Sequence, residues 1–296
     1  MECWRSTTIT RLRRTAIDAA IALTLFGCIP VVVRSISANA FTIGIFRLTI
    51  ATLGLGAMMA FRRQLRRVPP RDLARLAVIG FLFFAHWLTL FLGIKASSAS
   101  IGAIGLSTYG AHLLILGALF GGARVRASDV VAVLIAILGA LLVVPKFDLG
   151  NDVALGMLLS SASALLYASL PLLHQRWSHI ANSTRALGQF AFALAFFLLF
   201  VGKADWTLTG RDWGGLLFLA VGVTLIGHSL WVRVTTRLSS PATSILYYAN
   251  IPIAIALSAL LLGERLTIRS AIGAMLIIGA GVLGLSRRIT RVRDAV

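Results

Sequence analysis

Charged residues are scarce in this sequence, and acidic ones most of all. Asp and Glu together number 10 in 296 residues, and all charged residues make up only 13%. Soluble domains carry about 25% charged residues, so the composition excludes an ordinary soluble protein. No acidic residue falls near the middle of an apolar run. We therefore expect no strong proton or sodium coupling through a carboxylate, whereas coupling through histidine stays open.

Cysteine and the common catalytic motifs are also missing. The two cysteines are Cys3, near the N-terminus, and Cys28, inside an apolar run, which excludes a disulfide framework and a CxxC metal site. The sequence has no GxxxxGK[ST] phosphate loop and no GxSxG elbow. His174 and His179 are five apart, whereas HExxH places its histidines four apart. We expect no catalytic residues, no metal and no cofactor.

Long apolar runs are what the sequence has in abundance. Hydrophobic residues make up 58% of the chain, and its mean hydropathy is +0.90. A bilayer core about 30 Å thick needs about 20 helical residues, and ten segments are long enough to cross it, the fifth only barely. They lie at about 15–34, 39–61, 73–94, 98–120, 129–145, 153–174, 183–202, 212–232, 241–262 and 268–286. The expected fold is an all-α membrane protein with ten transmembrane helices.

The net charge of +18 follows from the loops. With a cytoplasmic N-terminus, 20 of the 28 Lys and Arg residues lie on the cytoplasmic side, 7 lie on the other side and Arg47 lies within a span. This asymmetry predicts that both termini are cytoplasmic, in a bacterial-type inner (plasma) membrane. The expected partners are the lipid bilayer and a small-molecule substrate, with no nucleic acid. Monomer and dimer both stay open.

One stretch of the chain occurs twice. Residues 80–98 return 142 positions later as residues 222–240, which aligns His86 with His228. Each copy of the repeat holds five predicted spans, and an odd number of spans turns the second copy upside down. Transporters with inverted repeats bind their substrate near the bilayer midplane between the two copies. The predicted units are a tail (1–14), a first repeat (15–145), a second repeat (152–286) and a second tail (287–296).

Two segments resemble a known family. Residues 239–266, SSPATSILYYANIPIAIALSALLLGERL, resemble the signature of the EamA type of the drug/metabolite transporter superfamily, and residues 86–104, HWLTLFLGIKASSASIGAI, resemble its first-half counterpart. The resemblance covers essentially the whole chain and implies a 5+5 inverted repeat. Within this family, the sequence resembles aromatic amino-acid exporters of the YddG kind. The repeats differ where Ala123 stands opposite Glu264. We expect Glu264 to be an interfacial cap or to form a loop ion pair with Arg265 or Arg269, with a substrate role as the alternative.

Rings and small polar groups at mid-depth form the candidate substrate site. Single aromatic residues at helical spacing are usually packing, but five spans that each place a ring beside a polar group predict an amphipathic cavity. Trp87 follows His86 directly, so its side chain points about 100° away from that of His86 around the helix axis, and we expect it to face lipid or a neighbouring helix. The candidate substrate-binding residues are His86, Thr89, Tyr109, His112, Ser163, Tyr167, Thr224, His228, Trp231, Tyr247, Tyr248 and Asn250.

Prolines within the spans are candidate hinges, because proline cannot donate a backbone hydrogen bond and displaces the carbonyl four residues earlier. They are Pro30, Pro171 and Pro252. A tolerated kink is the alternative interpretation.

Two charges fall within spans. Leaving Arg47 unpaired costs at least ~2.5–3.5 kcal/mol. Phe26 lies at a similar depth, so we expect Arg47 to donate to the Phe26 carbonyl, with binding of a substrate carboxylate as the alternative. Asp18 is expected to cap a helix or to pair with Arg13 or Arg14, with proton coupling as the alternative.

The expected function is alternating-access export of small amphipathic metabolites, above all aromatic or hydrophobic amino acids, by facilitated transport or exchange. Drug-like organic cations are the first alternative, although they would favour carboxylates in the cavity. Nucleotide sugars would favour several cavity Lys or Arg residues. The enzyme-class alternative is a haem protein ligated by His86, His112 and His228, but haem bundles pair histidines across helices and a second pair is lacking.

Overall fold

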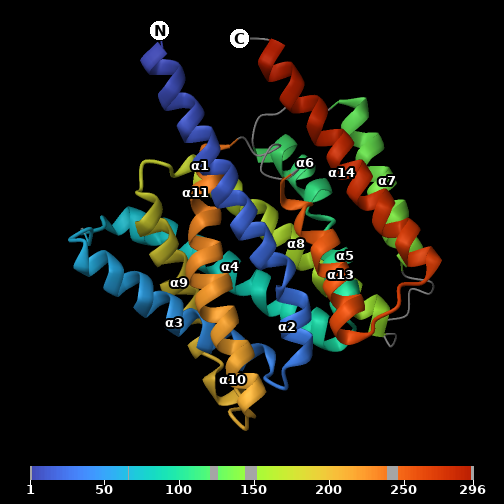
Figure 1. Cartoon of the computed structure of the whole chain (residues 1–296), viewed down its shortest axis with the longest axis horizontal. Helices are drawn as coiled ribbons and strands as arrows, with labels where there is room; N and C mark the ends of the chain where they lie inside the picture. Colours follow the sequence, from blue (N-terminus) through green and yellow to red (C-terminus); the bar gives the residue numbers. More distant parts are fainter. Residues whose placement is uncertain (1, 66, 121–125, 144–151, 239–245, 295–296) are drawn as a thin grey trace.

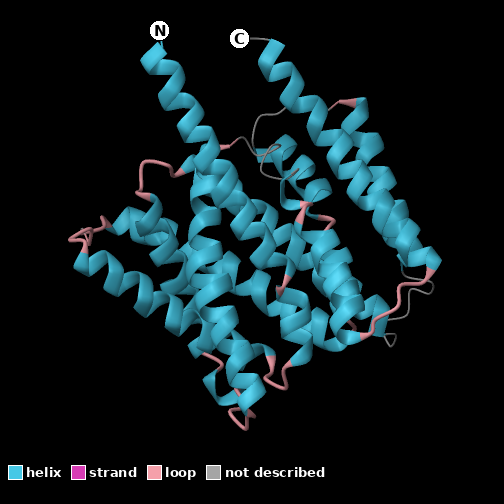
Figure 2. Ribbon diagram, viewed as in Figure 1, coloured by secondary structure: helices cyan, strands magenta, loops and turns pink. Residues whose placement is uncertain are grey.

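The computed structural model describes residues 2–65, 67–120, 126–143, 152–238 and 246–294. Every regular element in these ranges is a helix (Figure 2). The first half contains α1 (Glu2–Gly27), α2 (Ile29–Ser35), α3 (Ala40–Phe61), α4 (Pro70–Ala96), α5 (Ala99–Leu106), α6 (Tyr109–Phe120) and α7 (Ala127–Val143). The second half contains α8 (Asp152–Arg176), α9 (Asn182–Leu198), the 3-10 turn η1 (Val201–Lys203), α10 (Gly210–Leu217), the π-helix η2 (Phe218–His228), α11 (Ser229–Arg237), α13 (Asn250–Leu262) and α14 (Ile268–Asp294).

The helices are apolar and long enough to cross a bilayer many times, so the chain is a multi-pass membrane protein. Six helical stretches in the described ranges have both the length and the hydropathy of a full span: Arg14–Ser35, Ala40–Phe61, Pro70–Ala96, Ala99–Phe120, Asp152–Arg176 and Gly210–Arg237. Three shorter apolar helices are Val130–Gly139, Asn250–Leu262 and Ile268–Ala280. The all-α expectation is confirmed, while the count of ten spans stays a prediction.

The helices pack so that the two halves interpenetrate. In Figure 1, α4 runs across the molecule, where it packs against α8 and α9. Helix α1 packs against α11, α13 and η2, and α7 pairs with α14 at one edge of the molecule. The largest apolar core draws buried residues from both halves of the chain. A site inside this core is therefore built by both halves.

Two helices are interrupted at equivalent places. Helix α5 ends at Leu106 and α6 begins at Tyr109, while α13 begins at Asn250 directly after a turn. Ser107 and Tyr248, which lie in these two interruptions, are 141 positions apart, close to the offset of the sequence repeat. Interrupted helices leave backbone groups free of the helical ladder, and transporters use such groups at their substrate sites.

The three candidate hinge prolines occupy different positions in their helices. Helix α1 breaks at Cys28, and Pro30 lies in the first turn of α2, where a missing N–H costs nothing. Pro252 likewise lies in the first turn of α13. Pro171 lies inside α8, which continues through it to Arg176. Pro30 therefore coincides with a break in its span, whereas Pro171 is accommodated within a continuous helix.

Candidate functional site

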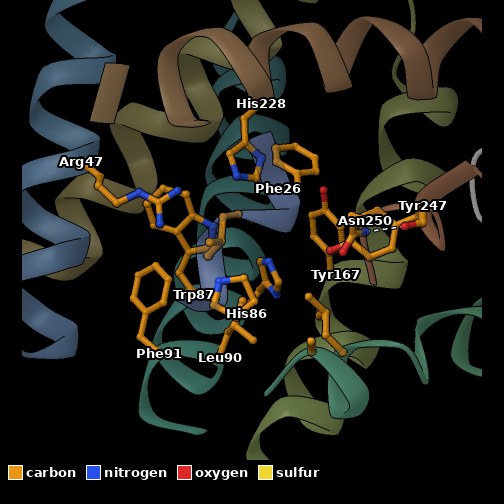
Figure 3. Close-up of a pocket in the computed structure, with 14 residues that line it drawn as sticks. Phe26, Arg47, His86, Trp87, Leu90, Phe91, Tyr167, His228, Tyr247 and Asn250 are labelled. Atoms are coloured by element: carbon orange, nitrogen blue, oxygen red, sulfur yellow. Dashed lines mark hydrogen bonds between the residues drawn. The ribbon is translucent and has the colours of Figure 1, made fainter. Parts of the chain in front are cut away.

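Side chains from both halves meet around a pocket in the core (Figure 3). In this view Arg47 and Phe91 lie on one side, and Tyr167, Tyr247 and Asn250 lie on the other. The cavity has a volume of about 10 Å³, which is room for about one water molecule, so its walls nearly touch in this conformation. The lining residues are Phe26, Ile29, Pro30, Arg47, His86, Trp87, Leu90, Phe91, Ala103, Leu106, Tyr167, His228, Tyr247 and Asn250.

Tyr167 and Tyr247 line one wall of the site, and Tyr109 packs behind them. The ring centroid of Tyr109 lies 4.8 Å from that of Tyr247 and 5.6 Å from that of Tyr167, and the Tyr167 and Tyr247 centroids are 5.3 Å apart. These separations are in the range of favourable aromatic contacts. Phe26 extends the cluster, 6.4 Å from Tyr247. The wall therefore offers ring faces and phenol hydroxyls to the same space.

His86 is held in one orientation by Ser163 of α8. The Ser163 hydroxyl donates to the His86 carbonyl at 2.9 Å, while Nδ1 of His86 lies 2.6 Å from the Ser163 hydroxyl oxygen and 3.2 Å from the Ser163 carbonyl oxygen. A carbonyl oxygen only accepts, so we assign the imidazole proton to Nδ1. Nε2 of the neutral ring is then an acceptor. Tyr167 stacks on the imidazole at 4.3 Å.

His228 lies in an aromatic enclosure. Its ring centroid is 4.6 Å from Phe26, 5.0 Å from Phe83 and 5.5 Å from Trp87. Its Nε2 atom is buried and has no hydrogen-bond partner. A buried polar atom without a partner costs free energy, so this nitrogen is a site at which a ligand would gain a hydrogen bond.

Arg47 is the charged group of the pocket. Its side chain is fully buried, its guanidinium carbon lies 3.9 Å above the Trp87 ring, and Nε donates to the Thr224 hydroxyl at 3.0 Å. Nη1 and Nη2 have no hydrogen-bond partner within the described part of the chain. The predicted bond from Arg47 to the Phe26 carbonyl is therefore wrong, because the guanidinium instead stacks on Trp87 and uses Nε to reach η2.

The other candidate residues divide into those beside the pocket and those away from it. Ser163 and Thr224 bind lining residues, as described above, and Tyr109 and Trp231 pack behind the ring wall. Thr89 turns its hydroxyl back to the carbonyls of Ala85 and His86. Tyr248 and His112 are not among the lining residues. His86, Tyr167, His228, Tyr247 and Asn250 are the predicted binding residues that line the pocket.

Trp87 is a pocket residue that the sequence analysis did not count among the binding candidates. It is 1% exposed and lies under Arg47 of α3, so of the two expected orientations it faces a neighbouring helix and not lipid. A signal was present, because Phe83, Trp87 and Phe91 recur every fourth residue and so share a face of α4. All three are buried. These aromatic side chains lie beside His86 on α4 and widen the face that α4 presents to the site.

Polar contacts fix the loop between α2 and α3 at the end where α10 begins, at the bottom of Figure 1, here named the α10 end. Asp212 accepts hydrogen bonds from the Ser37 amide at 2.6 Å and from the Ser37 hydroxyl at 2.8 Å. Lys95 donates to the Ile36 carbonyl. The loop between α2 and α3 is thereby tied to both α4 and α10.

Ion pairs join the halves at the opposite end, which carries both chain termini in Figure 1 and is here named the terminal end. Asp18 pairs with Arg233 at 3.2 Å and with Arg237 at 3.8 Å. The expected partners were Arg13 or Arg14. The structure gives Asp18 partners from α11 because α1 packs along α11 in the fold, a proximity that local sequence cannot reveal.

Comparison with known proteins identifies the family. The model of the EamA-like transporter family matches residues 14–144 and again residues 154–287. The uncharacterized transporter YxxF of Bacillus subtilis (strain 168) is 24% identical over 285 residues, covering 92% of this chain and 89% of the relative. A solved structure, described only as the crystal structure of a protein, superposes with a TM-score of 0.68 at 16% identity, covering 92% of this chain and 96% of the other. The chain belongs to the EamA-like transporter family and is a membrane transporter rather than an enzyme.

Proposed function

We propose that this transporter exports small amphipathic metabolites, foremost aromatic or hydrophobic amino acids, by alternating access through the pocket between its halves. The observation that carries the proposal is the ring-lined wall of Tyr167, Tyr247 and Phe26 beside the imidazoles of His86 and His228. Ring faces bind flat apolar bodies, and a few placed polar groups fix their orientation.

Transport through this pocket requires its walls to separate. Ligand pockets usually enclose ~300–1,000 Å³, far more than the present cavity. The interruptions at Ser107, at Tyr248 and at Cys28 before Pro30 are the places where spans can bend without losing further helical hydrogen bonds. In the proposed cycle, bending there opens the α10 end and the terminal end in turn. The 5+5 inverted repeat, the inner-membrane location and cytoplasmic termini belong to the same proposal.

The two alternative substrate classes fit the pocket less well. None of the described residues that line the pocket is acidic, so an organic cation would meet no charged partner among them and would face Arg47. A nucleotide sugar carries two phosphates, and Arg47 is the single Lys or Arg among the lining residues. A ligand of modest size with one ring system and few charges matches these walls best.

Reconstituted transport tests the proposal. Purified protein in liposomes is expected to show saturable uptake of radiolabelled phenylalanine or tryptophan, and His86→Ala is expected to lower it. His179→Ala is the matched control, because His179 is exposed and its contact with Asp72 lies outside the pocket. Uptake measured with and without a pH gradient reports coupling. Equal uptake by wild type and His86→Ala would remove His86 from the site, and a lack of saturable uptake of any aromatic amino acid would refute the substrate class.

A further inference from the structure

We propose that the pocket is selective for carboxylates, with Nη1 and Nη2 of Arg47 as the groups that bind the carboxylate of the transported molecule. The inference rests on the proposed function and narrows it, because it makes the carboxylate the required group of the substrate and the amino group dispensable. Its ligands are aromatic carboxylic acids, of which aromatic amino acids are one kind.

The position of the guanidinium is fixed before any ligand arrives. Its Nε is committed to Thr224 at 3.0 Å, and one face lies 3.9 Å above the Trp87 ring. Phe91 lies at 5.4 Å from the guanidinium carbon. These contacts hold the plane of the group and leave the edge that carries Nη1 and Nη2 without a protein acceptor. A carboxylate accepts two parallel hydrogen bonds from such an edge.

The Arg47 cation also has no counter-ion among the residues that the structure describes. The ion pairs found in the described ranges use Asp18 and Asp72 as acids, and neither involves Arg47. A fully buried charge without a partner is costly to keep in an apolar core. An anionic ligand would supply that partner and would be bound more strongly because the site excludes water.

Among the described residues, the rest of the pocket offers neutral acceptors but no negatively charged partner for an ammonium. Its polar groups beyond Arg47 are the imidazoles of His86 and His228, the indole N–H of Trp87, the hydroxyls of Tyr167 and Tyr247 and the amide of Asn250, none of which is a carboxylate. The charge pattern therefore complements a net anion better than a zwitterion. Figure 3 places the tyrosines on the side opposite Arg47, so a ligand would extend from the guanidinium to the ring wall.

Four compounds that share a phenyl ring separate the contribution of the ligand's carboxylate to binding from that of its amine. Competition against radiolabelled phenylalanine uptake in proteoliposomes would use 3-phenylpropanoate, phenylalanine, phenylalaninamide and phenethylamine, which differ in the carboxylate and the amine while keeping the ring. We expect 3-phenylpropanoate to compete at least as well as phenylalanine, and the two compounds without a carboxylate to be at least 10-fold weaker. Binding of the same series, measured as the ligand-induced rise of Tm in detergent, gives a second readout.

Substitutions of Arg47 then test whether this residue binds the carboxylate. Arg47→Gln is expected to abolish the 10-fold preference for carboxylates. Arg47→Lys is expected to keep part of it, because lysine supplies the charge but not the planar pair of N–H donors of a guanidinium. Arg62→Gln, an exposed position just after α3, should leave the preference intact. Without ligand, the Tm of Arg47→Gln is expected to equal or exceed that of wild type, because an unpaired charge is removed. A Tm well below wild type would indicate a structural arginine.

The outcomes distinguish the two proposals. Equal competition by all four compounds, or an unchanged preference in Arg47→Gln, overturns the role of Arg47 while the aromatic pocket stands. Failure of every member of the series to compete or to raise the Tm overturns both.

Discussion

Glu264, in the loop before α14, caps a helix that belongs to the other half of the chain. Its two carboxylate oxygens accept hydrogen bonds from the amides of Ala99 and Ser100, each at 2.9 Å. These are the first residues of α5, where free N–H groups and the helix dipole favour a negative charge. The expectation of a helix cap is confirmed, although the helix lies 165 residues away. In the first repeat the equivalent residue is Ala123, which has no carboxylate to offer.

Glu264→Gln is expected to destabilise the protein by about 1 kcal/mol, because the loss of a cap typically costs that much and the amide NH₂ opposes the α5 N–H groups. Thermal unfolding in detergent measures the effect as a lower Tm. Asp205→Asn is the control, since the Asp205 carboxylate contacts the exposed Thr207 amide and its loss should leave the Tm nearly unchanged. Equal Tm values for Glu264→Gln and wild type would contradict the capping role.

Asp212 and Ser37 are expected to act as one unit at the α10 end. Ser37→Ala removes the 2.8 Å bond between the hydroxyl and the carboxylate, and Asp212→Asn weakens both that bond and the one to the Ser37 amide. Side chains that share an interaction show non-additive effects, so the double variant should lose less Tm than the two single losses combined. Strict additivity would show that the contact contributes nothing in the membrane protein as purified.

Ser163→Ala is expected to weaken substrate affinity less than His86→Ala does. The serine hydroxyl accepts from Nδ1 of His86, and a hydrogen bond contributes about 1 kcal/mol net, which corresponds to a roughly fivefold rise of KM for uptake. The backbone carbonyl of Ser163 still holds the ring in the variant. Ser160→Ala, one turn earlier on α8, removes a buried hydroxyl that has no partner and should leave KM unchanged. A KM for Ser163→Ala equal to that of wild type would show that the hydroxyl does not position His86.

Gly80 and Gly222 occupy the same place in the sequence repeat but are expected to respond differently to alanine. A Cβ on Gly80 would overlap the Cβ of Phe192 and lie 2.9 Å from the amide nitrogen of Ala193, because α4 and α9 cross there. Overpacking of this kind costs about 1–3 kcal/mol. A Cβ on Gly222 would find its nearest neighbour at 3.6 Å. Gly80→Ala should lower the Tm, and Gly222→Ala should not; the reverse order would contradict the packing.

The sequence predicted the membrane fold and part of the site because both depend on local signals. Apolar runs identify spans, and the alignment of His86 with His228 drew attention to two residues that line one pocket. The partners of Arg47 and Asp18 could not be predicted, because they come from helices 177 and 215 residues away. The sequence left open whether Trp87 faces lipid or a neighbouring helix, because the rotation of α4 about its axis depends on helices that are distant in the sequence.

The contacts that join the two halves differ between the two ends of the molecule, and we expect them to respond differently to ionic strength. The Asp18 pair at the terminal end involves Arg233 and Arg237, whose side chains are 42% and 32% exposed, and dissolved salt screens exposed charges. At the α10 end, Asp212 binds the backbone amide and the hydroxyl of Ser37, and counterions screen the dipoles of these groups far less. High salt concentration should therefore weaken the contacts between the halves at the terminal end more than those at the α10 end.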